Sequence, residues 1–533
     1  VGMCNGEYLA SNATATTTTK PSGGYAYYED GTLTLNNYSY TGEGYEYDSN
    51  SACAAIYFNP ADENAELTIE LVGTNTVIID NSECTSDAIY IANGNLIIEG
   101  NGSLTATGHT GIYAWGNISI SGENTSVIAT GNYGIQTNGG DIDIDGGKVE
   151  ANGFYNGIVA YGNISISSGE VRATATYEYG TGIYAEGNID IDGGKVEANG
   201  GYGGIYSSGN IDIDGDKVDA TGSLDYGIYA AGPLTINGGI VTVKGSEAGI
   251  YVENNITIDS GTVKATASGD YGIGIVAYAV TVNGGTVEAI STGEYGYGMT
   301  FYDAPTLNGT LAVYAGEDAA TAVRVAAPTD STYQTKYVKI AVPYCDVVID
   351  YGIDGVDNGE ITIIEGNTVS LENPVIDGYI FMGWFTDTTY QTAFDFTNPI
   401  TANTTIYAKF ADYEGDKKAL QDAIDALEAD VAELNMLTKN GGTIDQINAK
   451  ISAIESKVLE LVALKNKYAE ADAALKQQLE AADAAINAAI AALTVRVQDL
   501  EAGLADANSK INTKKRILIS VLEAVSWIGT FGI

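Results

Sequence analysis

The sequence is poor in histidine, cysteine and basic residues, and each shortage excludes a class of protein. It contains one histidine, four cysteines and 24 basic residues against 69 acidic ones, so the formal net charge is −45. A single histidine excludes His-rich metal sites and His-paired nucleophiles. Four cysteines are too few for a disulfide scaffold. The small number of cations excludes ordinary nucleic-acid binding and disfavours docking on an anionic membrane.

Proline is rare as well, whereas glycine and tyrosine are abundant. The 8 prolines and 66 glycines fit neither collagen nor a proline-rich linker. The 37 tyrosines outnumber the 9 phenylalanines, and tyrosine suits contact surfaces better than deep cores because it joins an apolar ring to a hydroxyl group. Hydrophobic residues make up 45% of the chain, which is enough for a packed core.

The first 340 residues repeat with a period near 23. One unit, GNIDIDGGKVEANGGYGGIYSS from Gly187, holds three short segments of alternating hydrophobicity separated by glycine-rich turns. Such alternation predicts strands. Three strands in each unit predict a mainly β fold, a right-handed three-sided parallel β-helix over residues 1–340, with coils about 4.8 Å apart. The glycine that begins the repeat recurs at Gly94, Gly116, Gly139, Gly162, Gly187, Gly209 and Gly232.

Three stretches of this array carry a family resemblance. They are GTLTLNNYSYTG (31–42), LTIELVGTNTV (67–77) and the repeated G-N-I-x-I-x-G-G-x-V-x-A. Through them the first 340 residues resemble the clostridial carbohydrate-binding β-helix family, which is related to polysaccharide lyases. The resemblance implies a secreted, calcium-associated protein that binds plant-type polysaccharide, such as cellulose or a pectin-like polymer.

The period is lost in residues 343–412. There the stretch GYIFMGWFTDTTYQTAFDFTNPITANTTIYAKF (378–410) is similar to the internalin-type B repeat, also called the Listeria–Bacteroides repeat. The resemblance implies a small β-grasp-like domain of the kind found in bacterial surface proteins, and we expect it to act as a spacer. Phe381 and Trp384 are expected to pack in its core and not to bind glycan.

Residues 416–516 have a helical pattern. They are rich in Ala, Leu, Glu and Lys, and their apolar residues recur in steps of four and three. This heptad rhythm predicts an α-helical coiled coil or a long helical hairpin, which would form a stalk and could join chains into a homo-oligomer. The rhythm runs through Leu420, Ile424, Leu427, Val431 and Leu434, then from Ile444 to Leu461 and from Ile486 to Leu504.

Residues 517–533 are apolar except for Glu523 and follow a cluster of three basic residues. Their length is near the lower limit of about 17–25 residues for a membrane span. One interpretation is a truncated membrane anchor, with membrane or cell-wall attachment at this end of the chain. Glu523 and the preceding basic cluster count against the anchor, and the alternative is the apolar end of the coiled coil.

The predicted first strand of several repeats carries outward aspartates. Asp190 would lie one strand spacing from Asp212, and Asp192 would lie at the same distance from Asp214. Four carboxylates this close repel one another unless a cation neutralises them, and calcium takes several oxygen ligands. We therefore expect a calcium site at Asp190, Asp192, Asp212 and Asp214. The alternative is a solvated acidic stripe that serves solubility.

The predicted third strand carries outward tyrosines. Rings repeated at about 4.8 Å could offer apolar faces to successive sugars of an extended polysaccharide. Alternatively, the rings stack on one another and stabilise the solenoid without a ligand. The predicted ligand-binding residues are Tyr113, Trp115, Tyr161, Tyr184, Tyr206, Tyr229 and Tyr251. A second set, at the turn, is expected to wall a groove: Tyr133, Tyr155, Tyr179, Tyr202, Tyr226, Tyr271 and Tyr295.

These features predict an extracellular protein of the bacterial cell surface or envelope that binds polysaccharide and is not an enzyme. Its solenoid would be displayed on the spacer and the stalk. One alternative is a calcium-dependent polyuronate lyase that uses an Arg or Lys base. Arg172, however, lies between Glu150 and Glu197 in one column, and the glutamates fit a role as salt-bridge partners. The other alternative is a non-catalytic adhesin that contacts host protein.

Overall fold

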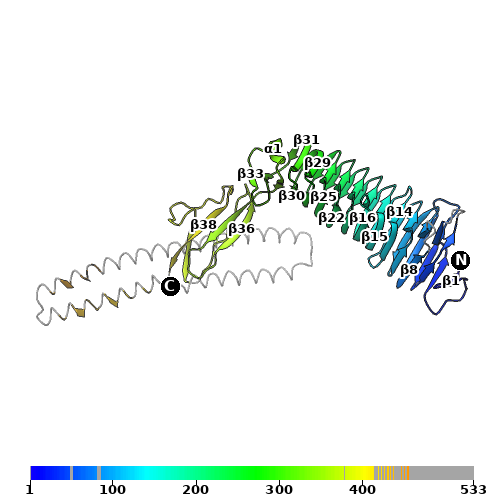
Figure 1. Ribbon diagram of the computed structural model, residues 1–533. Helices are drawn as coiled ribbons and strands as arrows, with labels where there is room; N and C mark the ends of the chain where they lie inside the picture. The colour runs from blue at the N-terminus through cyan, green and yellow to red at the C-terminus, as the bar shows by residue number, and fades with distance from the viewer. Residues whose placement is uncertain are drawn as a thin grey trace, which may run out of the picture. The chain divides into compact units, whose positions relative to one another are not determined.

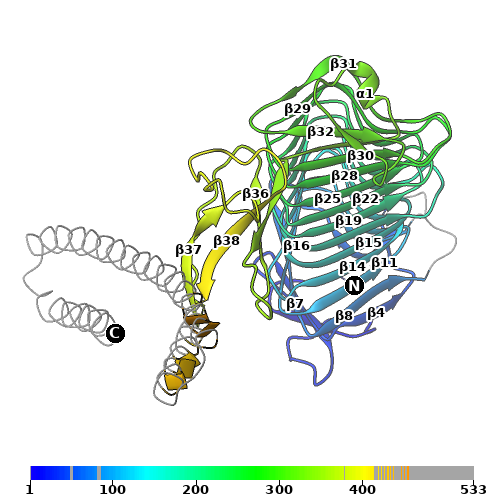
Figure 2. The same ribbon diagram turned by 90° about the vertical axis from the view of Figure 1, so that its left-hand side faces the viewer.

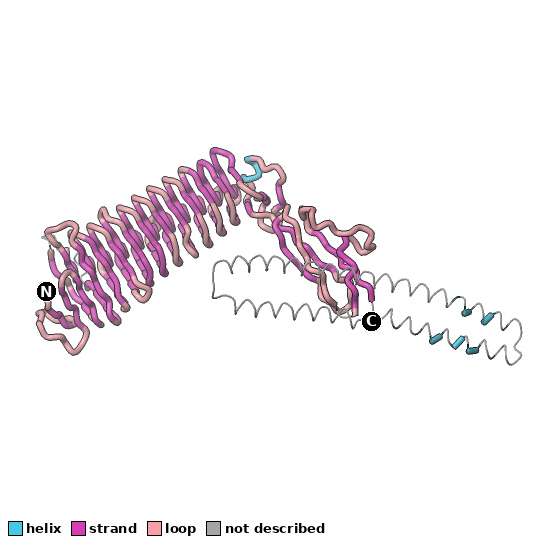
Figure 3. The backbone as a smooth tube through the Cα atoms, turned by 180° about the vertical axis from the view of Figure 1, so that it is seen from behind, coloured by secondary structure: helices cyan, strands magenta, loops and turns pink. Residues whose placement is uncertain are grey.

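The computed structural model describes residues 2–47, 52–80, 86–376 and 378–412, together with scattered helical positions between 418 and 456. The chain divides into two compact units, Val1–Pro343 and Tyr344–Ile533. In the first unit, successive coils of short strands follow one another from the N-terminus to β31 (Tyr297–Leu307), as the ribbon in Figure 1 and the backbone tube in Figure 3 show.

The first unit is a parallel β-solenoid with three sides. Ile142 pairs in parallel register with Ile118 of the preceding coil and with Ile164 of the next. The second strand of each repeat pairs in the same way with the second strand of the next repeat, as Val196 with Val218. The third strands form a third parallel ladder, as Ile205 with Ile228. Figure 2 shows strands of the array as stacked rungs. The three-sided parallel arrangement expected from the sequence is confirmed.

The sides are called first, second and third in the order in which the chain passes through each coil. The first side comprises β3 (Thr32–Asn36), β7 (Glu66–Val72), β10 (Asn95–Gly100), β13 (Ile118–Ser121), β18 (Ile189–Ile191), β21 (Ile211–Ile213), β24 (Leu234–Ile236) and β27 (Asn255–Ile258). The second side comprises β4 (Ser39–Gly42), β8 (Thr74–Ile79), β11 (Ser103–Thr107), β19 (Lys195–Gly200), β22 (Lys217–Gly222), β25 (Ile240–Gly245), β28 (Thr262–Ala267) and β30 (Thr286–Ser291).

The third side carries the tyrosines. It comprises β6 (Cys53–Phe58), β9 (Ser86–Ile91), β12 (Thr110–Ala114), β17 (Thr181–Ala185), β20 (Gly203–Ser207), β23 (Tyr226–Ala230) and β26 (Ala248–Val252). Five longer strands turn one or two corners and serve more than one side: β14 (Ser126–Thr137), β15 (Ile142–Ala160), β16 (Ile164–Ala175), β29 (Ile273–Val282) and β31.

The inward columns of all three sides are mainly aliphatic. Ile189 and Ile191 on the first side, Val196 on the second and Ile205 on the third are fully buried in one continuous core. Because side chains of a strand alternate between its two faces, the residues between them remain at the surface. No single coil could bury this much apolar surface, so the core exists only through stacking.

A ladder of amide side chains holds the corner before the first side. The Asn163 side-chain carbonyl accepts the backbone N–H of Asn188 at 2.8 Å, and the Asn188 carbonyl accepts that of Asn210 at 2.9 Å. A Cβ at Gly209 would lie 2.4 Å from the Asn188 oxygen. The Gly-Asn pair that begins several repeats therefore stabilises the corner, because the glycine leaves room for the asparagine side chain of the preceding coil.

Antiparallel strands close both ends of the solenoid. At the N-terminal end β2 (Tyr25–Glu29) pairs with β1 (Glu7–Ala10) and β3, and β5 (Tyr45–Glu46) pairs with β6. At the other end β34 (Tyr337–Ala341) pairs with β30 and β32 (Ala312–Gly316), and β32 also pairs with β33 (Val323–Val325). The short helix α1 (Asp330–Tyr333) precedes β34. Such ends protect the terminal coils from pairing with other chains.

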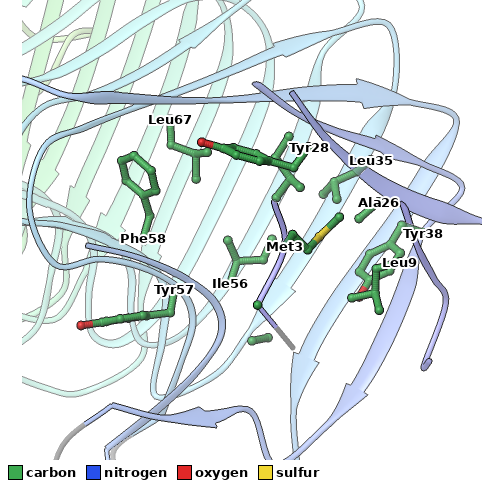
Figure 4. Close-up of a pocket in the computed structure, with 13 residues that line it drawn as sticks. Met3, Leu9, Ala26, Tyr28, Leu35, Tyr38, Ile56, Tyr57, Phe58 and Leu67 are labelled. Carbon is green, nitrogen blue, oxygen red and sulfur yellow. The ribbon is translucent and has the colours of Figure 1, made fainter. Parts of the chain in front are cut away.

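An apolar hollow of about 370 Å³ lies inside the N-terminal end. Met3, Leu9, Leu35, Ile56 and Phe58 are among the side chains that line it (Figure 4). These residues are part of the solenoid core or pack against it. We therefore interpret the hollow as an incompletely filled end of that core.

The described strands of the second unit form a four-stranded mixed sheet in the order β36 (Gly359–Ile364), β35 (Tyr344–Asp350), β38 (Thr404–Asp412), β37 (Tyr379–Phe385). The two central strands run parallel, and the outer pairs are antiparallel. Phe381 and Trp384 are buried and pack edge to face with ring centroids 5.0 Å apart. Their predicted place in the core of a small β domain is confirmed.

The predicted coiled coil at 416–516 lies outside the described residues, apart from the scattered helical positions. Among these positions, the Lys450 ammonium contacts the carboxylates of Asp430 at 2.8 Å and Glu433 at 2.5 Å. The apolar segment 517–533 also lies outside. In the part of the chain that the structure describes, no helix is long and apolar enough to cross a membrane.

Candidate functional site

Aromatic side chains gather on the third side of the solenoid. Each third-side strand places an isoleucine inward and, in most coils, a tyrosine at the next, outward position, as with Ile205 and Tyr206. Further aromatic residues occupy the turns before and after this strand, for example Tyr271 and Trp115. Three rows of rings therefore run along one side.

The middle row contains a continuous stack of four tyrosines. In this tyrosine stack, formed by Tyr184, Tyr206, Tyr229 and Tyr251, neighbouring ring centroids are 5.2, 4.4 and 5.7 Å apart and neighbouring planes lie within 14° of parallel. The ring faces cover one another, so ring edges and hydroxyl groups point outward. This arrangement fits the stabilising role that the sequence left as an alternative to sugar stacking.

The middle row is not continuous along the whole solenoid. Gln136 and Val159 occupy the equivalent positions between Tyr113 and Tyr184. Tyr113 stacks instead on Tyr90 of the preceding coil, with centroids 5.0 Å apart. The row expected from the sequence as one column is therefore two separate stacks.

Two hydroxyl groups of the middle row have a carboxylate or an indole as hydrogen-bond partner. Tyr229 donates a hydrogen bond to Glu253 at 2.6 Å, and the Trp115 indole donates one to the Tyr90 hydroxyl at 3.1 Å. Burial, followed by the hydrogen bond to Glu253, raises the pKa of Tyr229. Tyr229 therefore presents a neutral phenol group at physiological pH.

The rings in the row after the strand are the most accessible of the predicted binding residues. Trp115 and Tyr161 are 49% and 45% exposed, whereas the five predicted tyrosines of the middle row are half-buried. Tyr278 and Tyr302 continue this row and stack at 5.1 Å. The exposed rings of this row therefore lie in coils before and after the tyrosine stack, because Glu186, Ser208, Ala231 and Glu253 occupy the equivalent positions beside the stack itself.

A surface hollow of about 550 Å³ lies at the C-terminal end of the tyrosine stack. It spans the starts of β23, β26 and β29, and Tyr226, Tyr251, Tyr271, Glu247 and Asp270 contribute to its lining. Burial, then the charge of Glu247, raises the pKa of Tyr226 to about 12. Tyr226 and Tyr271 were expected to wall a groove, but the sequence did not predict that this end of the stack is hollow.

The outward aspartates of the first side lie in the predicted column. Asp190 pairs in register with Asp212, and burial, followed by the charges of Asp212 and Asp192, raises the pKa of Asp190. Among the described residues, however, no three His, Cys, Asp or Glu side chains lie where they could hold one metal ion. The residues do not fit a preformed calcium site, so calcium at Asp190, Asp192, Asp212 and Asp214 stays a prediction.

The charged columns of the second side form ion pairs between coils. Lys195 contacts Glu170 at 3.1 Å, and Arg172 contacts Glu197 at 3.7 Å. Arg172 thus has the glutamate partner that the sequence indicated. These contacts are exposed and each contributes less than about 1 kcal/mol.

The fold and its aromatic side define a repetitive solenoid of the kind that presents an extended binding surface. Residues 46–272 match the model of a family described as carbohydrate-binding domain-containing protein. Residues 349–409 match the Listeria-Bacteroides repeat domain. Both resemblances found in the sequence are confirmed, and the first match includes the tyrosine stack. No curated protein and no solved structure matches the chain.

Proposed function

We propose that this chain is a carbohydrate-binding protein of the bacterial surface whose solenoid binds an extended polysaccharide along its third side. The observation that carries the proposal is the placement of three aromatic rows on this one side, most of whose rings lie within the segment that matches a carbohydrate-binding family. The match to the Listeria-Bacteroides repeat supports display at the surface. No covalent chemistry is required.

The two kinds of aromatic row would contribute differently. The exposed rings of Trp115 and Tyr161 would contact the apolar faces of sugars, because their own faces are accessible. The tyrosine stack would offer hydroxyl groups at the spacing of the coils, and carboxylates such as Glu253 would accept hydrogen bonds from sugar hydroxyls. The stack would also hold the side rigid, so little conformational entropy would be lost on binding.

A sedimentation assay with insoluble polysaccharides and the full chain tests this proposal. The double variant Trp115→Ala/Tyr161→Ala should bind at least about tenfold more weakly, because exposed aromatic anchors dominate such contacts. Tyr344→Ala, which removes an exposed tyrosine from the second unit, should bind like the parent chain. Failure of the parent chain to bind any polysaccharide would overturn the proposal. Release of an unsaturated product absorbing in the ultraviolet would identify a polyuronate lyase instead.

A further inference from the structure

The hollow beside Tyr251 exists because the tyrosine stack ends there. Tyr229 covers one face of Tyr251, with ring centroids 5.7 Å apart. On the other side, the register pairs Tyr251 with Val276, whose smaller side chain lines the hollow. One face of the last ring is therefore left without a tyrosine partner from the next coil.

A second ring, Tyr271 of the coil after Tyr251, borders the hollow. Tyr295, which comes from the coil after Tyr271 and is not part of the lining, stacks on Tyr271 with ring centroids 5.2 Å apart, whereas the residues that line the hollow belong to the coil of Tyr271 or to preceding coils. The Tyr271 face that Tyr295 leaves uncovered is thus the one that borders the hollow, and Tyr271 is 75% exposed. The volume of about 550 Å³ lies within the range of small-ligand sites.

Charge is distributed unevenly around the solenoid. Among the residues that the structure describes, the hollow is lined by two exposed carboxylates, Glu247 and Asp270, and by no basic residue. The six Lys and Arg residues between positions 52 and 310 all lie in strands of the second side: Lys148, Arg172, Lys195, Lys217, Lys244 and Lys264. A polyanion on the third side would meet carboxylates without cations to balance them.

We propose that the hollow between Tyr251 and Tyr271 is a subsite for an uncharged sugar residue, and that Glu247 and Asp270 make it select neutral glycans over polyuronates. The inference rests on the proposed function and narrows its ligand class. The two rings contact the apolar faces of the sugar, and the carboxylates accept hydrogen bonds from its hydroxyl groups. A uronate in the same place brings a third negative charge into the hollow.

Calorimetric titration of the full chain tests the subsite. The probes are neutral β-linked hexasaccharides of glucose, xylose, mannose and galactose, together with hexagalacturonic acid. We expect at least one neutral probe to bind and hexagalacturonic acid to bind at least about tenfold more weakly. Tyr271→Ala should weaken neutral binding about tenfold. The control is Tyr344→Ala, a tyrosine of the second unit that is 60% exposed and outside the hollow, and it should have no effect.

A double variant tests the role of the two carboxylates. Glu247→Gln together with Asp270→Asn keeps hydrogen-bonding side chains but removes both charges, so binding of hexagalacturonic acid should strengthen about tenfold. Tighter binding of hexagalacturonic acid than of every neutral probe by the parent chain would overturn the selectivity. Equal binding by Tyr271→Ala and Tyr344→Ala would overturn the subsite while leaving carbohydrate binding intact. Absence of binding to any probe and to long polysaccharides would overturn the proposed function as well.

Discussion

The inward and outward columns of the solenoid obey different rules, although they belong to the same strands. Inward positions such as Ile189 and Ile205 are aliphatic and fully buried in most coils of the array. Outward positions change from side to side: aspartates on the first, ion pairs on the second and tyrosines on the third. Stacking of the coils requires apolar side chains at inward positions, whereas outward positions can vary. Residues that serve a function are therefore expected at outward positions, where the repeats differ most.

The largest effect should come from shortening an inward side chain. Ile205→Ala leaves a cavity in a core that neighbouring coils cannot close, and should lower the free energy of unfolding by about 2–5 kcal/mol. Thr262→Ala removes an exposed outward side chain and should change it by less than about 0.5 kcal/mol. Urea unfolding followed by circular dichroism compares the two. Similar losses for both variants would contradict the distinction between inward and outward columns.

Substitutions in the asparagine ladder at the corner before the first side should have the next largest effect on the free energy of unfolding. Gly209→Ala places a Cβ 2.4 Å from the Asn188 oxygen and should cost about 1–3 kcal/mol. Asn188→Ala removes the hydrogen bond to the Asn210 N–H and should cost about 0.5–1.5 kcal/mol. Because the Asn188 side chain is the nearest obstacle, Gly209→Ala should cost less in the Asn188→Ala background. Additive losses in the same unfolding assay would show that the glycine is needed for another reason.

Extending the tyrosine stack of the third side by one ring should weaken sugar binding and stabilise the fold. Val276→Tyr would place a fifth ring against Tyr251 and fill the hollow. Binding of the neutral hexasaccharide should fall about tenfold, while stacking should raise the free energy of unfolding by about 0.5–1.5 kcal/mol. Val159→Tyr is the matched control, since it adds a ring to the middle row away from the hollow. Calorimetry and thermal melting separate the two effects, and unchanged binding by Val276→Tyr would contradict the subsite.

The fold could be predicted from the sequence because the inward columns are nearly uniform. A period near 23 with Ile189 and Ile191 repeated as Ile211 and Ile213 leaves few alternatives to stacked coils. The role of the Gly-Asn pairs could not be predicted, since it depends on the path of the turn. It is the folded turn that brings the Asn188 side chain to the backbone of the next coil.

The candidate site was predictable in position but not in shape. The sequence placed Tyr184, Tyr206, Tyr229 and Tyr251 on one column, yet it could not give ring orientation, which decides that their faces are covered. The gap at Gln136 is visible in the sequence, because glutamine stands there where the preceding repeat has Tyr113. The hollow depends on the pairing of Tyr251 with Val276, 25 residues later, and turns of unequal length hide that register in the sequence.

The acidic column of the first side should give the smallest effect. Burial and two neighbouring carboxylates raise the pKa of Asp190 in the folded chain, so the folded state holds this proton more tightly than the unfolded state does. Ionisation as the pH rises through that pKa therefore lowers stability, and the penalty vanishes below the unfolded pKa of about 3.9. Asp190→Asn should raise the melting temperature slightly at pH 7 and leave it unchanged near pH 3.

Thermal unfolding of the same variants also tests whether the chain binds calcium. A solvated stripe predicts that Asp190→Asn stabilises the chain in chelator and in calcium alike, because no ion depends on the carboxylate. A bound calcium ion predicts the opposite sign: calcium raises the melting temperature of the parent chain, and Asp190→Asn or Asp212→Ala removes most of that gain. The carboxylates do not converge on one point among the described residues, so a calcium-dependent gain would require the aspartates to move together around the ion.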